Sequence, residues 1–200
     1  MTTHGMRRAI PARRWLPALL AVAVSVPLAA CDDSVSDLGN QVIATIAGYT
    51  MSAADSGPLD RGTASQSLPT QAAQTASALD AAGFRGGYSR IFLRGGAAAG
   101  DYVLVSVYAM ASAESSTRFL ASERGALQST GTVVLFSATG VADSVGFTLT
   151  GPTQRGDRQV FCDGVAFAKG ARVYAVTTCS ATPEDSRLAV DVAQQQARAG

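Results

Sequence analysis

Two cysteines in the C-terminal half of the chain have the spacing of a cross-strand disulfide. Residues 158–168 and 172–179 show the side-chain alternation of two β-strands and are separated by a short turn containing Gly170. Antiparallel pairing across this turn places Cys162 directly opposite Cys179. Opposed β-carbons in a hairpin are close enough for a disulfide bond. The spacing therefore predicts a Cys162–Cys179 disulfide, a bond typical of oxidising compartments outside the cytoplasm.

The same register sorts the other side chains of the hairpin into two faces. On one face Val165 meets Val176 and Phe167 meets Tyr174, as expected of a core face. The cysteine face carries small residues, so we expect a helix to lie close to it. Two other roles for the cysteine pair are weaker, because a thioredoxin-like site uses Cys-x-x-Cys and a thiolate metal site needs more ligands.

The third cysteine, Cys31, ends an N-terminal segment with the pattern of a signal peptide. Four arginines precede an apolar run over residues 15–28, which is shorter than a membrane span and contains two prolines. The stretch Leu28-Ala29-Ala30-Cys31 resembles the lipobox of bacterial lipoprotein signals. The resemblance implies removal of residues 1–30 and a diacylglyceryl group on the sulfur of Cys31, and two acyl chains make a stable anchor. Ordinary signal cleavage and a retained membrane helix are the alternatives.

Removal of residues 1–30 would leave a chain without histidine, because His4 is the single histidine. That excludes a Ser-His-Asp triad, a Cys-His dyad, a histidine-ligated zinc and a histidine pH switch. Twelve basic residues would then face fifteen acidic ones, a net charge of −3. A mildly acidic protein is a poor partner for nucleic acid or anionic lipid, so we expect neither of these electrostatic partners.

The remaining polar candidates lack a recognisable catalytic or metal-binding pattern. The carboxylates available for acid–base chemistry or calcium are not spaced as in a calcium loop, and we assign them to solvated turns and caps. Five arginines and four aromatic residues are assigned to the surface and to sheet packing, although they could line a patch or a groove. We therefore expect no cofactor, no metal and no catalytic residue. The residues in question are Asp143, Asp157, Asp163 and Asp185; Arg85, Arg90, Arg94, Arg155 and Arg158; and Tyr88, Phe92, Tyr102 and Tyr108.

Hydrophobic periodicity predicts an α+β fold with a single antiparallel sheet of about six strands and helices packed on it. Residues 102–110 are apolar on both faces, so they predict a central strand that is covered on both sides. Helices are expected at residues 69–82, from Ser112 and from Thr182. The strands are expected at residues 88–94, 102–110, 132–137, 144–150, 158–168 and 172–179.

Residues 31–68 are rich in small and polar residues and are interpreted as a lipidated, partly ordered tether before a single domain at 69–200. A flexible linker of about 25 residues spans roughly 25–30 Å, enough to lift the domain clear of a bilayer. An apolar patch within residues 42–51 does not fit a pure linker, and it could be a short helix or strand docked on the domain.

Three segments of the chain resemble uncharacterised actinobacterial secreted lipoproteins. In that pattern a helix ends at Gly83-Phe84, a Tyr-x-Arg strand follows from Tyr88, and a valine-rich strand leads into a helix near Ser112. The order of strands and helices is also remotely similar to the PsbP/Mog1-like fold. Neither resemblance implies a catalytic residue.

These observations together favour a binding protein over an enzyme. We expect a lipoprotein anchored through Cys31 on the outer face of the cytoplasmic membrane, binding an envelope protein or a small envelope ligand. A carrier of lipid or another hydrophobic ligand is the alternative, and it would need a large apolar cavity. A histidine-free hydrolase is the third class, and it would need carboxylates clustered in a cleft.

Overall fold

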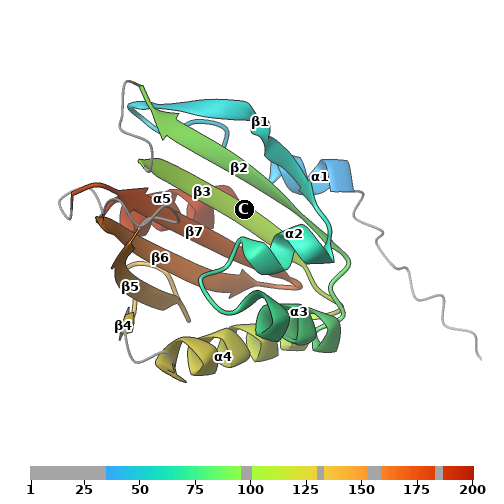
Figure 1. Cartoon of the computed structure of the whole chain (residues 1–200). Helices are drawn as coiled ribbons and strands as arrows, with labels where there is room; N and C mark the ends of the chain where they lie inside the picture. The colour runs from blue at the N-terminus through green and yellow to red at the C-terminus, as the bar shows by residue number, and fades with distance from the viewer. Residues whose placement is uncertain (1–34, 96–100, 130–132, 153–158, 183–186) are drawn as a thin grey trace, which may run out of the picture. The chain divides into compact units, whose positions relative to one another are not determined.

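The structure, a computed structural model, describes residues 35–95, 101–129, 133–152, 159–182 and 187–200. They form an α+β unit in which one antiparallel sheet is covered by helices on both faces, and Figure 1 shows α2, α3 and α4 in front of the sheet and α5 behind it. The helices are α1 (Val35–Asn40), α2 (Arg61–Gln66), α3 (Ala72–Ala81), α4 (Ala113–Ser129) and α5 (Leu188–Ala199). The strands are β1 (Tyr49–Leu59), β2 (Gly86–Arg94), β3 (Tyr102–Ala109), β4 (Val133–Phe136), β5 (Val145–Pro152), β6 (Gln159–Lys169) and β7 (Arg172–Ser180).

The sheet has seven strands in the order β1-β2-β3-β7-β6-β5-β4, one more than the predicted six. Each half is an antiparallel meander, and the halves join where β3 pairs with β7. The prediction that residues 102–110 form a central strand covered on both faces is confirmed. Val105 packs in one core and Tyr108 in the other, and both side chains are fully buried.

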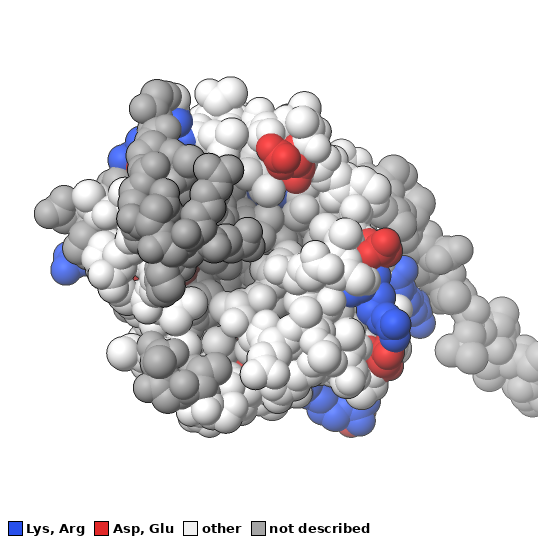
Figure 2. All heavy atoms as spheres, viewed as in Figure 1, with Lys and Arg blue, Asp and Glu red and all other residues white. Residues whose placement is uncertain are grey.

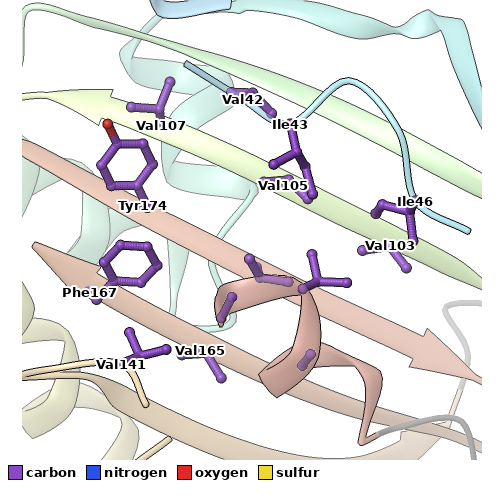
Figure 3. Close-up of a cluster of buried hydrophobic side chains, with 14 of the residues drawn as sticks. Val42, Ile43, Ile46, Val103, Val105, Val107, Val141, Val165, Phe167 and Tyr174 are labelled. Atoms are coloured by element: carbon purple, nitrogen blue, oxygen red, sulfur yellow. The ribbon is translucent and has the colours of Figure 1, made fainter. Parts of the chain in front are cut away.

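One core lies between the sheet and the elements α1 and α5. Figure 3 shows Val105 of β3 beside Ile43 of the segment after α1, and Val103 beside Ile46. A buried glutamine, Gln196 of α5, ties this segment to the helix. Its side-chain amide donates to the carbonyl of Gln41 (2.6 Å) and accepts from the N–H of Ile43 (3.0 Å), so both functional groups of the buried side chain are satisfied.

The second core lies under α2, α3 and α4 and contains Leu79, Phe119 and Tyr108. The small residues of the cysteine face, Ala166 and Ala175, lie here, and α4 packs against β6 and β7. Small side chains let the helix approach the strands, so the predicted close packing on this face is confirmed.

Residues 35–68 belong to the folded unit, which corrects their interpretation as a tether. They form α1, β1 and α2, and the apolar patch predicted at 42–51 contributes buried Val42, Ile43 and Ile46 to the core. The strand β1 was missed because its register shifts between Ser52 and Gly57, which breaks the two-residue alternation. As an edge strand it also buries few side chains and tolerates proline.

Helix α5 begins at Leu188, later than the start predicted at Thr182. The residue at the N-cap position is Arg187, whose side chain makes no capping hydrogen bond. Residues 183–186, which carried the predicted capping pattern, lie outside the described residues.

Two aromatic rings lie over glycines of neighbouring strands in the C-terminal half of the sheet. Phe136 of β4 is paired with Gly146 of β5, and Phe147 of β5 is paired with Gly164 of β6. A β-carbon added at Gly164 would lie 2.0 Å from the Phe147 ring, and one at Gly146 would lie 2.4 Å from the Phe136 ring. These glycines are needed because no side chain fits between the rings and the neighbouring backbone.

Candidate functional site

The cysteine hairpin has the register that the sequence predicts. Cys162 is the direct partner of Cys179, Val165 of Val176 and Phe167 of Tyr174. A disulfide joins the two cysteines, whose Cα atoms are 4.2 Å apart. The hydroxyl of Tyr102 lies 3.3 Å from the sulfur of Cys179. The disulfide therefore links the start of β6 to the end of β7, and both of its cysteines are buried.

Cys31, the predicted lipidation site, lies outside the described residues. None of the described helices is long and apolar enough to cross a membrane.

A groove of about 560 Å³ lies between α4, the β4–β5 connection and the tip of the β6–β7 hairpin. Apolar residues such as Leu120 and Val145 form part of its lining. Polar groups come from Thr117 and Arg124 of α4 and from the β4–β5 connection. The complete lining is Ala113, Thr117, Leu120, Ala121, Arg124, Ser137, Val141, Asp143, Ser144, Val145, Ala168 and Gly170. This size suits a small-molecule ligand.

Two opposite charges in this groove have no ion-pair partner among the described residues. Arg124 and Asp143 are both exposed, and neither takes part in a described salt bridge. Arg124 also lines a smaller adjoining hollow of about 160 Å³, so its side chain lies where the two spaces meet. An arginine can bind a carboxylate with two parallel hydrogen bonds, and an aspartate can accept from an ammonium group.

The β4–β5 connection that carries Asp143 is held by a local hydrogen bond. The backbone N–H of Ala138 donates to the hydroxyl of buried Ser144 (2.9 Å). Asp143 has a φ of +50°, in the left-handed region that few residues other than glycine adopt. The connection thus holds an acidic residue in a left-handed backbone conformation beside the groove.

A second groove of about 560 Å³ lies at the β1–α2 corner, and two of its three charged residues are engaged in the fold. Arg61 pairs with Asp80 across 2.5 Å. Asp60 caps α2 by accepting from the N–H of Thr63 (2.8 Å), and this backbone hydrogen bond lowers the pKa of the Asp60 carboxyl. The third charged residue, Arg85, is exposed and takes part in no described salt bridge. Because this groove offers one available charge whereas the groove at Arg124 offers charges of both signs, the groove at Arg124 is the stronger candidate site.

The structure describes two of the four predicted carboxylates, and they lie on different elements, Asp163 on β6 and Asp143 in the β4–β5 connection. Asp163 is in the middle of β6, is buried, and accepts from the hydroxyl of Thr148 (2.7 Å), so its assignment to a solvated turn was wrong. Asp143 does lie in an exposed turn, whereas Asp157 and Asp185 lie outside the described residues. Within the described ranges, no group of three or more His, Cys, Asp or Glu side chains could hold a metal ion.

Glu123 of α4 is a buried carboxyl, 5% exposed, that the sequence did not indicate as a candidate. The hydroxyl of Thr70 donates a hydrogen bond to Oε2 of Glu123 (2.6 Å). The hydroxyls of Thr70 and Thr75 are also hydrogen-bonded to each other. The other carboxyl oxygen, Oε1, has no hydrogen-bond partner within the described part of the chain. Burial raises the pKa of Glu123, against an opposing effect of the threonine hydroxyls. The burial of this carboxyl was not predicted, because Glu123 falls among the apolar residues on one face of its helix.

Replacing Glu123 by glutamine is expected to change how stability depends on pH. Because the pKa is raised in the native state, the stability due to the bound proton is fully present below the unfolded pKa. It is lost as pH rises through the native pKa. We expect the free energy of unfolding of the natural protein, relative to Glu123→Gln, to fall in urea titrations as pH rises above about 4, the usual pKa of an unfolded glutamate.

The control for this measurement is Glu114→Gln, which removes an exposed carboxyl from the same helix. It corrects for the change in net charge. A difference between the natural protein and Glu123→Gln that is constant or rises over this pH range would contradict the prediction.

Of the five arginines assigned to the surface, Arg85 is exposed as predicted, whereas Arg90 and Arg94 lie against aromatic rings. Arg90 donates to the carbonyl of Val42 and lies over the ring of Tyr88, 5.9 Å from its centre. Arg94 lies over the ring of Tyr49 at 5.4 Å. The predicted sheet-packing role is confirmed for Phe92 and Tyr108, which are buried in the two cores, whereas Arg155 and Arg158 lie outside the described residues.

The class of fold is thus an α+β sandwich in which one antiparallel sheet has helices on both faces. No family model and no curated protein sequence matches the chain. The crystal structure of the extracellular domain of PknH from Mycobacterium tuberculosis is similar, with a TM-score of 0.56 and 11% sequence identity. The likeness covers 82% of this chain and 96% of that domain, and at this identity it shows a shared fold alone.

Proposed function

We propose that this protein is a non-enzymatic binding module of the bacterial cell envelope, anchored on the outer face of the cytoplasmic membrane through a lipid on Cys31. The observation that carries the binding role is the groove in which Arg124 and Asp143 stand without ion-pair partners among the described residues. The lipobox-like end of the signal segment supports the anchor. The Cys162–Cys179 disulfide and the fold shared with an extracellular domain support a place outside the cytoplasm.

The groove fits a small zwitterionic ligand, such as an amino acid or a short peptide, better than a lipid. Arg124 would receive the ligand's carboxylate and Asp143 its ammonium group, while Leu120 and Val145 contact apolar parts. A lipid carrier needs an apolar cavity of several hundred Å³ between sheet and helices. The two cores instead contain large buried side chains such as Phe119 and Phe92, so the carrier role has less support.

Binding of a panel of zwitterionic dipeptides by calorimetry tests this role. We expect Arg124→Gln to weaken binding about tenfold to a hundredfold, because a hydrogen bond to a charged group contributes about 1.5–3 kcal/mol. Arg118→Gln is the matched control, since Arg118 is on the same helix, pairs with Glu114 and does not line the groove. Equal losses in both variants, or no binding of any zwitterion, would contradict the proposal.

A further inference from the structure

We infer that the sheet itself determines how the groove is presented. The edge formed by α1, β1 and β2 rests on the bilayer, and the groove at Arg124 is held at the opposite edge, away from the lipid. This inference rests on the proposed anchor at Cys31. It differs from the sequence-based expectation, in which a long flexible tether would separate the domain from the membrane.

Only a short stretch of chain separates the proposed anchor from the folded unit. Helix α1 begins at Val35, four residues after Cys31. Even a fully extended chain of four residues spans at most about 14 Å. A lipid on Cys31 therefore keeps the start of α1 close to the headgroups, where the tether first expected would have allowed roughly 25–30 Å.

Helix α1 is firmly packed on the sheet. Leu38 of α1 is 1% exposed, and a β-carbon added at Gly39 would lie 3.2 Å from the ring of Tyr88 on β2. Directly after the helix, Gln196 of α5 holds the backbone of Gln41 and Ile43. The helix cannot leave the sheet as a hinged extension of the tether without breaking these contacts, so the anchor fixes the sheet edge as well.

The groove and α1 lie at opposite edges of the sheet. Helix α1 packs mainly on β2, whereas the groove lies beside β4 and β5 at the other edge. Five inter-strand steps separate β2 from β4, which corresponds to about 24 Å at about 4.8 Å per step. Figure 1 shows α1 and β4 on opposite sides of the molecule. The width of the sheet therefore acts as the spacer between membrane and ligand.

The surface charges indicate which lipid to use in a test. Figure 2 shows acidic and basic side chains together on the side where α2 and α3 lie, and a largely uncharged surface over the middle of the described molecule. The elements proposed to face the bilayer also carry both signs, with Asp37 on α1 and Asp55 on β1 against Arg90 and Arg94 on β2. Because the signs are mixed, the orientation should come from the short anchor and not from lipid charge, so neutral lipid is the appropriate probe.

Tryptophan reporters in the full lipidated chain test the orientation. The chain has a single tryptophan, Trp15, which lies in the predicted signal, so an added tryptophan is the sole reporter after processing. We choose Asp37→Trp on α1 and Val134→Trp on β4, where the natural side chains are exposed. In vesicles of phosphatidylcholine that carries a nitroxide quencher on its headgroup, we expect strong fluorescence quenching for Asp37→Trp and almost none for Val134→Trp. Equal quenching, or stronger quenching of Val134→Trp, would overturn the inference.

Two controls separate the orientation from the anchor. Inserting about 20 Gly and Ser residues after Asp33 gives a linker with a reach of about 25 Å, which should relieve the quenching of Asp37→Trp while the protein still floats with the vesicles. Cys31→Ser should abolish flotation in every background. If the natural protein does not float with vesicles, the anchor proposal fails. If it floats but the insertion leaves quenching unchanged, the short-linker inference fails on its own.

Discussion

Replacing Gly164 by valine is expected to lower the free energy of unfolding by about 3 kcal/mol, at the upper end of the usual cost of overpacking. A β-carbon at this position would lie 2.0 Å from Cε1 of Phe147. The Phe147 side chain is 5% exposed and belongs to the neighbouring strand β5, so its ring has little room to move. The variant must displace the ring or bend β6 away from β5, and either change disrupts packing beneath α4.

The matched control is Gly151→Ala on β5, where nothing lies within 4 Å of the added β-carbon. Because alanine reduces the freedom of the unfolded chain, this variant should be neutral or slightly stabilising. Urea titrations of both variants at constant pH provide the comparison. Similar free energies for the two variants would show that Phe147 adapts to a side chain at Gly164, contrary to the prediction.

Replacing both Cys162 and Cys179 by alanine is expected to lower the free energy of unfolding by about 3 kcal/mol. The disulfide closes a loop with a sequence separation of 17 residues, and a loop of this length restricts the unfolded chain by about that amount. Both cysteines are buried beside Tyr102, so the alanines also lose some packing. The expected loss is measured by urea unfolding under non-reducing conditions.

Reductant supplies the internal control for this second prediction. It should lower the stability of the natural protein toward that of the double-alanine variant and leave the variant itself unchanged. If the natural protein is equally stable with and without reductant, while mass spectrometry shows free thiols, the disulfide does not contribute the predicted stability.

The part of the fold that could be predicted depends on local patterns. Strands β2 to β7 lie within a few residues of their predicted positions, because each has alternating or continuous apolar residues bounded by turn residues. The hairpin register was predictable because the turn at Gly170 is short and register follows from turn length. Strand β1 lacked this signal, since its bulge and its exposed, small residues conceal the alternation.

The candidate site could not be predicted because no local pattern encodes it. Arg124 comes from α4, Asp143 from the β4–β5 connection and Gly170 from the hairpin tip, three segments that meet only in the folded chain. The buried Glu123 was missed for a similar reason. A helical stripe indicates which side chains face inward, but it does not say that Thr70, far away in the sequence, supplies a hydroxyl to the carboxyl.

The sequence by itself determined the pairing of Cys162 with Cys179, the α+β class and, through the lipobox resemblance, the expected anchor at Cys31. These depend on short-range spacing, which the chain carries wherever it folds. The tertiary structure decided where the domain begins, because Val42 and Ile46 become core residues only when the sheet is there to cover them. It also decided which charges remain available for a ligand, since Arg61 is paired and Arg124 has no ion-pair partner among the described residues. Ion pairing and burial depend on contacts between distant segments, and spacing along the chain does not specify those contacts.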